Sequence, residues 1–182
     1  MKLHIFSSLF VLFTIIATVL ADNGHYTVPG LGKRKQQILK NGGTTLELAI
    51  AMLETDNMTT QYVYGDGKSG DSANFGIFKQ GWFILRSSVS EFKRYGPSDY
   101  NKGAVLNRHL AKDIKARQES QAHFGLDKWF AGHRNGETGI NDPYTQDIQD
   151  YKNGVYWIKA QLDSDKKYLS DNTRFWVYVK PI

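Results

Sequence analysis

Four carboxylates stand close together between residues 54 and 71, beside a strongly apolar run; they are Glu54, Asp56, Asp66 and Asp71. Glu54 ends the apolar run, so partial burial would raise its pKa and keep it protonated as a general acid. Asp66 and Asp71 lie in the polar stretch that follows, and either could face Glu54 as an ionised base. Two carboxyl groups in unlike surroundings can supply the acid and the base for cleaving a bond between sugars.

Each of these three carboxylates also has a purely structural explanation. Glu54 could be a solvated glutamate at a helix end, and Asp66 could be a turn residue in Gly-Asp-Gly. Asp71, followed by Ser72, could cap the next helix. The spacing alone does not choose between Asp66 and Asp71 as the partner of Glu54.

The segment after Asp66 carries side chains that could line the same cleft. Asn74 and Lys79 could form hydrogen bonds with sugar hydroxyls, although both could equally lie on an ordinary helix surface. The candidates for substrate contact in this segment are Asp71, Asn74, Phe75 and Lys79.

A second candidate binding segment is "KWFAGHRNG" at residues 128–136, which we predict to be a loop. Aromatic platforms with a few polar groups suit a carbohydrate groove. Trp129 could stack on a sugar face, while His133, Arg134 and Asn135 could donate to hydroxyls. The alternative is that the rings belong to the core, which we favour for Phe130, and that Arg134 pairs with a surface acid.

These candidates need elements that hold them in place, and the clearest is a helix ending at Glu54. The string Thr44-Thr45-Leu46-Glu47 is a capping box, and the residues after it are apolar on every face. Such a helix belongs in the middle of a domain. Tyr62-Val63-Tyr64 and the turn residues at 65–70 then predict a small β element.

Further helices are predicted from Asp71 to about Ser87, over residues 101–121, and from Asp142-Pro143 onward. The first would place Phe75, Phe78, Trp82 and Leu85 on one face. A final strand is predicted over residues 174–179. We therefore expect a single α+β domain, mostly helical, with a small β element after the buried helix.

The N-terminus predicts secretion. Residues 1–21 combine Lys2, an apolar run and small residues at the end, which is typical of a signal peptide. Residues 22–43 are polar, and we interpret them as an irregular arm, or as a propeptide removed at Lys33-Arg34. The catalytic domain is then predicted over residues 44–182, in a secreted, extracellular protein that acts as a monomer and is not held in a membrane.

Composition excludes several other classes of protein. With 182 residues, 41% of them hydrophobic, the chain can form a real core, and with no cysteine it lacks disulfides and thiolate chemistry. Without the leader, 22 basic and 18 acidic residues leave a net charge of +4, and no basic patch suggests nucleic-acid binding. The five histidines form no metal-binding string, and no G-x-S-x-G elbow occurs. We expect neither a metal nor an organic cofactor.

Three long strings carry a family resemblance: "LAIAMLETDNMTTQYVYGDGKSGDSANFGIFKQGWF", "ARQESQAHFGLDKWFAGHRNGETG" and "DPYTQDIQDYKNGVYWIKAQLDSD", the last followed by "NTRFWV". From about Thr44 onward the chain resembles glycoside hydrolase family 134, secreted endo-β-1,4-mannanases with a lysozyme-like fold. The resemblance implies hydrolysis of internal mannosidic bonds in β-1,4-mannan and manno-oligosaccharides, with inversion. It also implies that Glu54 is the general acid and Asp66 the general base.

Two other functions remain compatible with the sequence. A muramidase or chitinase-like hydrolase would keep the fold and act on N-acetylated sugars. A non-catalytic carbohydrate-binding or cell-wall protein would keep the groove without turnover, but binding alone requires neither Glu54 nor Asp66.

Overall fold

The structure is a computed structural model that describes residues 22–179, so the signal peptide predicted at residues 1–21 lies outside the described residues. The chain is mostly helical with two short antiparallel strand pairs, which confirms the predicted α+β, mostly helical class. Within residues 22–179, no helix is both long and apolar enough to cross a membrane. The helices are α1 (Leu31–Lys40), α2 (Thr45–Glu54), α3 (Trp82–Ser88), α4 (Leu110–Phe124), α5 (Leu126–Asn141) and α6 (Gln146–Asp163), and the strands are β1 (Asn23–Thr27), β2 (Asn74–Phe75), β3 (Gln80–Gly81) and β4 (Thr173–Val177).

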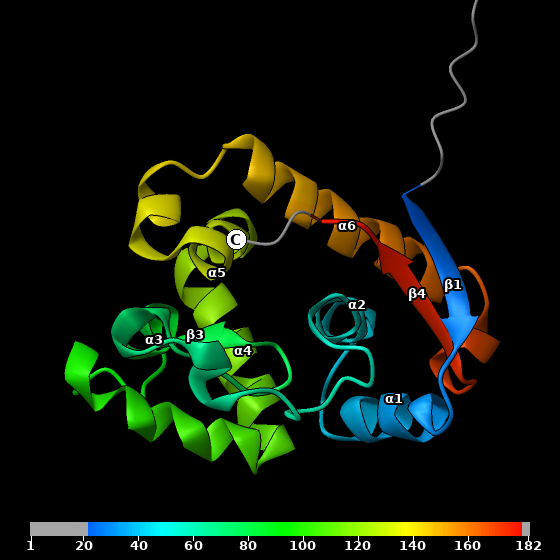
Figure 1. The fold of residues 1–182 in the computed structure, drawn as a ribbon, viewed down its shortest axis with the longest axis horizontal. Coiled ribbons are helices and arrows are strands. Elements are labelled where there is room, and N and C mark those ends of the chain that lie inside the picture. Colours follow the sequence, from blue (N-terminus) through cyan, green and yellow to red (C-terminus); the bar gives the residue numbers. More distant parts are fainter. Residues whose placement is uncertain (1–21, 180–182) are drawn as a thin grey trace, which may run out of the picture.

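Helix α2 runs through the middle of the molecule (Figure 1), and residues 48–52 are fully buried. The predicted capping box is present, because the Glu47 carboxylate accepts a hydrogen bond from the backbone N–H of Thr44 at 2.8 Å. Glu47 also forms a buried ion pair with Arg117 at 2.7 Å. The prediction of a buried helix that ends at Glu54 is confirmed.

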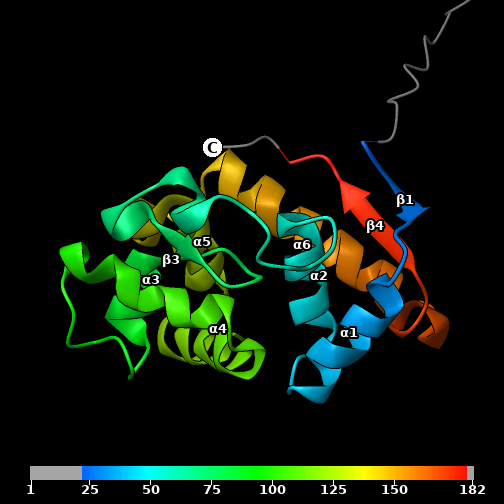
Figure 2. The same ribbon diagram turned by 60° about the horizontal axis from the view of Figure 1, so that its bottom comes forward.

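Two apolar clusters form the core. The larger one joins α1, α2, α6 and β4, and the smaller one surrounds Trp82 and includes Phe75 of the β2–β3 hairpin. In both views, α1, β1 and β4 lie at one end of the molecule and α3 and α4 at the other (Figures 1 and 2). The hairpin contributes to both clusters, Phe75 to the smaller one and Ile77 and Phe78 to the larger one, so its packing against α2 sets where their polar side chains meet.

Residues 22–43 are not an irregular arm, and that interpretation is wrong. Strand β1 pairs antiparallel with β4, with His25 opposite Phe175, and α1 packs on the larger cluster. The segment looks polar in the sequence, but one of its lysines, Lys35 of α1, is buried. Its ammonium donates to the carbonyl oxygens of Tyr168 and Thr173, each at 2.7 Å. A cut after Arg34 would separate β1 and divide α1; whether processing occurs there stays a prediction.

The helix predicted from Asp71 to Ser87 forms only over its last third, as α3. Before it, the chain makes a short 3₁₀ turn over Gly70–Ser72 and the β2–β3 hairpin, in which Gly76 and Lys79 have φ angles of 79° and 46°. A helix cannot continue through residues in these left-handed conformations, so the helix begins only at Trp82. The four residues predicted to be buried, Phe75, Phe78, Trp82 and Leu85, are all buried, but from a hairpin and a helix together.

Four other parts of the chain differ from the sequence prediction. The small β element is not at residues 62–64; Tyr64–Gly67 form a 3₁₀ turn, and the hairpin comes later. Residues 101–121 are divided between a 3₁₀ segment, Pro97–Asn107, and α4. The segment 128–136 is part of α5 rather than a loop, and α6 begins at Gln146, after Thr145 instead of Asp142. The final strand is confirmed as β4.

Candidate active site

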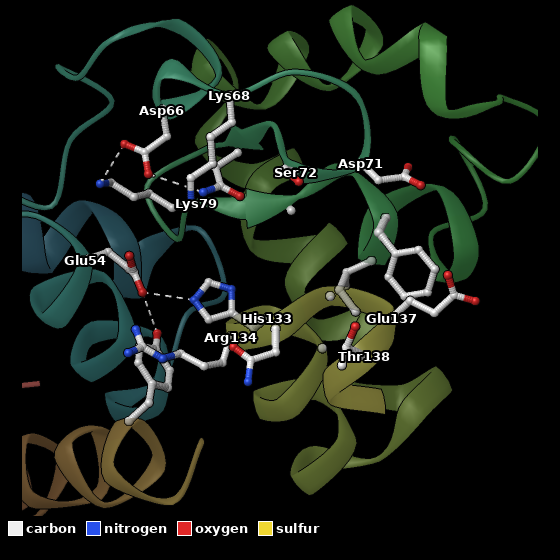
Figure 3. Close-up of a pocket in the computed structure, with 18 residues that line it drawn as sticks. Glu54, Asp66, Lys68, Asp71, Ser72, Lys79, His133, Arg134, Glu137 and Thr138 are labelled. Carbon is white, nitrogen blue, oxygen red and sulfur yellow. Dashed lines mark hydrogen bonds and ion pairs between the residues drawn. The ribbon is translucent and has the colours of Figure 1, made fainter. Parts of the chain in front are cut away.

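A cleft of about 650 Å³ lies between the end of α2, the β2–β3 hairpin and α5. It brings together Glu54 and Asp66, the two carboxylates predicted from the sequence. Figure 3 shows these two at one end of the cleft and Glu137 and Thr138 at the other. The remaining side chains that line it are mostly polar: Lys68, Asp71, Ser72, Asn74, Lys79, Phe83, Ile84, His133, Arg134, Asn135 and Tyr151.

Glu54 is the last residue of α2, so the buried helix carries its carboxyl group to the cleft wall. Its side chain is only 15% exposed. The hydroxyl of Tyr151, on α6, lies 2.6 Å from Oε1 of Glu54, and Nε2 of His133, on α5, lies 2.9 Å from the same oxygen. Glu54 is thus mostly buried against two aromatic side chains, as suits a general acid.

Asp66 has different surroundings. It lies in the 3₁₀ turn of Tyr64–Gly67 with a φ of 59°. The Lys79 ammonium donates to Oδ1 at 2.9 Å, and the Asn74 amide donates to Oδ2 at 3.3 Å. Partial burial raises the pKa of the Asp66 carboxyl, but these hydrogen bonds and the positive charge of Lys79 outweigh it and hold the pKa below its usual value. Asp66 is therefore ionised and ready to accept a proton.

Asp113, a buried residue of α4, holds the hairpin that carries Lys79 and Asn74 in place. This buried carboxylate accepts hydrogen bonds from the N–H of Ile77 at 2.6 Å and from the side chain of Gln80 at 2.7 Å. A Cβ atom on Gly76 would come within 2.0 Å of Asp113, so the turn fits only with glycine there. Burial raises the pKa of Asp113 to about 7, against the opposing effect of these hydrogen bonds.

Asp71 lines the cleft but has a structural partner. Its two carboxylate oxygens accept hydrogen bonds from Nε and Nη2 of Arg86, both at 2.6 Å. The bidentate pair ties the 3₁₀ turn of Gly70–Ser72 to α3. Asp71 is therefore not the cap of a long helix, as its sequence position suggested, and its oxygens already have partners.

Arg134 and Asn135 line the cleft as predicted, but each also contacts Asp147. The Asn135 amide donates to Asp147 Oδ2 at 2.8 Å, and Nε of Arg134 lies 3.8 Å from the same oxygen. Arg134 therefore both lines the cleft and pairs with a surface acid, so the two alternatives predicted for it are both observed. This contact lies next to Gly136, where the backbone of α5 is kinked.

The comparison with known families bears on this geometry. The family model described as glycosyl hydrolase family 134 matches residues 32–179. The chain belongs to this family. No curated protein matches it. Membership makes the chain a glycoside hydrolase, and the match begins within α1, upstream of the start predicted from the sequence.

Two residues expected to bind substrate in this family 134 hydrolase do not line the cleft. Trp129 and Phe75 are fully buried. Because 128–136 is helical, Trp129 lies one turn before His133 and stacks against it, with ring centroids 4.9 Å apart and planes 7° from parallel. Phe75 supports the site from the core, with Tyr64 against its ring edge.

Sequence reasoning missed Tyr151, which contacts Glu54 directly. It lies on α6 with Ile148 and Val155, and all three are buried. Its ring is indeed buried, and only the hydroxyl group reaches the site. The available signal was a phenol among aliphatic residues, because a buried tyrosine hydroxyl needs a hydrogen-bond partner. Lys68, Ser72, Phe83, Glu137 and Thr138 also line the cleft without having been singled out.

The contact between Lys79 and Asp66 predicts a pH effect in this hydrolase. Lys79 lowers the pKa of Asp66, and a base acts only when ionised, so with Asp66 as the expected base Lys79 should extend activity to lower pH. Lys79→Gln should therefore move the acidic limb of the kcat/KM profile to higher pH. Lys68→Gln is the matched control, because Lys68 acts on Asp66 only through space and should move the limb less. An acidic limb that stays in place in Lys79→Gln would contradict this assignment.

Proposed function

We propose that this glycoside hydrolase is a secreted endo-β-1,4-mannanase that works with inversion. The observation that carries the proposal is the pair of unlike carboxyl groups in one cleft: Glu54, mostly buried and paired with two aromatic side chains, and Asp66, paired with a cation. Such a pair can hold an acid and a base at the same pH. The choice of mannan as substrate rests on the family resemblance of the sequence.

In the proposed reaction, Glu54 donates its proton to the glycosidic oxygen as the bond from C1 to that oxygen breaks. Asp66 takes a proton from a water molecule, whose oxygen bonds to C1 from the opposite face. The product has an inverted anomeric centre. Proton exchange with solvent then restores protonated Glu54 and ionised Asp66. Because water attacks C1 directly, no covalent sugar–enzyme intermediate forms.

The extent of the cleft supports action on a polymer. Its lining continues from the two carboxylates past Ser72 and Phe83 to Glu137 and Thr138. Several sugars of a chain can lie along such a groove, leading away from the scissile bond. The polar side chains suit hydroxyl groups, and the ring of Phe83 in the lining could meet a sugar face.

The experiment measures reducing ends released from mannan, glucomannan, chitin and bacterial cell wall, and follows the anomeric configuration of the first products by NMR. We expect activity on mannan and glucomannan, with the α-anomer appearing first. Activity confined to chitin or cell wall would show that the substrate is a polymer of N-acetylated sugars instead of mannan. A β-anomer would indicate retention, which needs carboxyl groups only about 5 to 5.5 Å apart instead of roughly 6.5 to 9.5 Å.

Secretion is tested separately by expressing the full chain in a secreting host and sequencing the N-terminus of the product. A mature chain that begins near Asp22 is expected. A product that begins at Lys35 or beyond would instead show processing at the dibasic site, with loss of β1.

A further inference from the structure

The two oxygens of the Glu54 carboxyl group have unequal surroundings. Both hydrogen bonds that Glu54 makes within residues 22–179 end on Oε1, one from Tyr151 and one involving His133. Figure 3 shows both contacts converging on Glu54. A general acid has one proton, so its position on Oε1 or Oε2 decides whether it points into these partners or toward the cleft.

Tyr151 can act only as a donor to this oxygen under ordinary conditions. Its burial, followed by the negative charge of Glu54, raises the pKa of its hydroxyl well above the usual value, so the hydroxyl keeps its proton. The ring is also held in place by an edge-on contact with Phe130, at a centroid distance of 6.1 Å. The hydroxyl hydrogen therefore lies on the line to Oε1.

The protonation state of His133 follows from its other ring nitrogen. Nδ1 is buried and has no hydrogen-bond partner among the described residues. A proton on Nδ1 would leave an N–H group buried without an acceptor, which is unfavourable. The favoured form is neutral imidazole with its proton on Nε2, which donates to Oε1 of Glu54.

The orientation of His133 is itself set by the core. Its ring lies parallel to Trp129, and the guanidinium of Arg117 lies over the Trp129 ring, 4.5 Å from the centroid. Arg117 is in turn held by its buried ion pair with Glu47 at the start of α2. The same helix therefore carries Glu54 at its end and, through these contacts, anchors the ring that faces it.

We propose that His133 and Tyr151 are positioning residues that hold Oε1 of Glu54 as a double acceptor and leave the acid proton on Oε2, directed at the leaving oxygen. The inference rests on the proposed role of Glu54 as general acid. When Oε2 releases its proton, the carboxylate becomes negative, and hydrogen bonds to a charged acceptor are stronger than those to a neutral one. Both contacts thus strengthen as the glycosidic bond breaks, which is what accelerates a reaction.

The main test is Tyr151→Phe, which removes one donor and keeps the ring. Manno-oligosaccharide is compared with a dinitrophenyl manno-oligosaccharide, whose leaving group departs without protonation. With manno-oligosaccharide, kcat should fall about 10- to 100-fold, as for the loss of one hydrogen bond to a charged group, at nearly constant KM. With the dinitrophenyl substrate, kcat should change little.

Tyr156→Phe is the matched control, since Tyr156 lies on the same helix and also meets Phe130 edge-on, but is exposed. It should leave kcat and KM for both substrates unchanged. Equal losses of kcat on the two substrates in Tyr151→Phe would make Tyr151 a packing residue and overturn the proposal.

A measurement on the unmodified protein covers the case in which Tyr151→Phe does not fold. The ¹⁵N NMR signals of His133 should show a protonated Nε2 and an unprotonated Nδ1 at neutral pH. The reverse tautomer or an imidazolium would overturn the proposal. Glu54→Gln, measured on both substrates in parallel, distinguishes failure of the proposed function from failure of this inference. Full activity of Glu54→Gln refutes the proposed function. An inactive Glu54→Gln beside an unaffected Tyr151→Phe refutes only this inference.

Discussion

Glu54→Gln should abolish hydrolysis of mannan while the protein remains folded and still binds manno-oligosaccharides. The amide has no proton to give to the leaving oxygen, and a positioned general acid contributes about 10²- to 10⁴-fold to the rate. The side chain keeps its size, and its carbonyl oxygen can still accept hydrogen bonds from Tyr151 and His133. We therefore expect kcat to fall by that factor, measured by reducing-end release, with the melting temperature nearly unchanged.

Glu91→Gln provides the control for this change. Glu91 is an exposed glutamate that pairs with Lys112, away from the cleft lining. The same chemical change there should leave turnover intact. A folded Glu54→Gln enzyme with near-normal turnover on mannan would remove Glu54 from the role of acid.

The position of Glu54 could be predicted because its determinants are local. The capping box fixes the start of α2, and a run of residues apolar on every face can fold stably only in the interior. The end of such a helix must emerge at the edge of the core, where a carboxylate is partly desolvated. The structure follows this reasoning from Thr44 to Glu54.

Helix α5 could not be predicted from local preference, because it contains three glycines that weaken an isolated helix. Two of these glycines are instead places of close packing. A Cβ atom on Gly132 would come within 2.3 Å of Ile84, and one on Gly139 within 2.0 Å of the carbonyl oxygen of Ala131. Tertiary contacts therefore favour the helix where propensity does not, and the loop prediction misplaced Trp129 as a consequence.

The hairpin and the contacts of the two carboxylates depend on residues distant in sequence. The left-handed turn at Lys79 is stabilised by Asp113, more than thirty positions later, and Glu54 meets Tyr151 at a separation of 97 residues. The sequence near residue 79 does not indicate that α4 will supply a buried acceptor. The helix pattern pointed to Glu54 and the family resemblance to Asp66, but only the packing of the two apolar clusters determines what each one contacts.

The largest remaining effect is expected from the other member of the pair. Asp66→Asn should lower kcat by about 10²- to 10⁴-fold, because the amide cannot take a proton from water. The substitution suits the backbone, since asparagine accepts the φ of 59° as readily as aspartate does. Its side-chain oxygen can still accept from Lys79. The melting temperature should therefore change little, and a substrate titration should show nearly normal binding.

Asp71→Asn is the comparison that decides which aspartate is the base. Both oxygens of Asp71 are engaged by Arg86 in a partly exposed ion pair, so its loss should cost about 1 kcal/mol of stability and lower the melting temperature by roughly 2 to 4 °C. Turnover should largely persist, because Asp71 is held in a short bidentate pair with Arg86, whereas Lys79 and Asn74 each donate one longer hydrogen bond to Asp66. The two variants should thus fail in opposite ways: Asp66→Asn in rate at constant stability, Asp71→Asn in stability at nearly constant rate. An active Asp66→Asn enzyme beside an inactive but stable Asp71→Asn enzyme would transfer the role of base to Asp71.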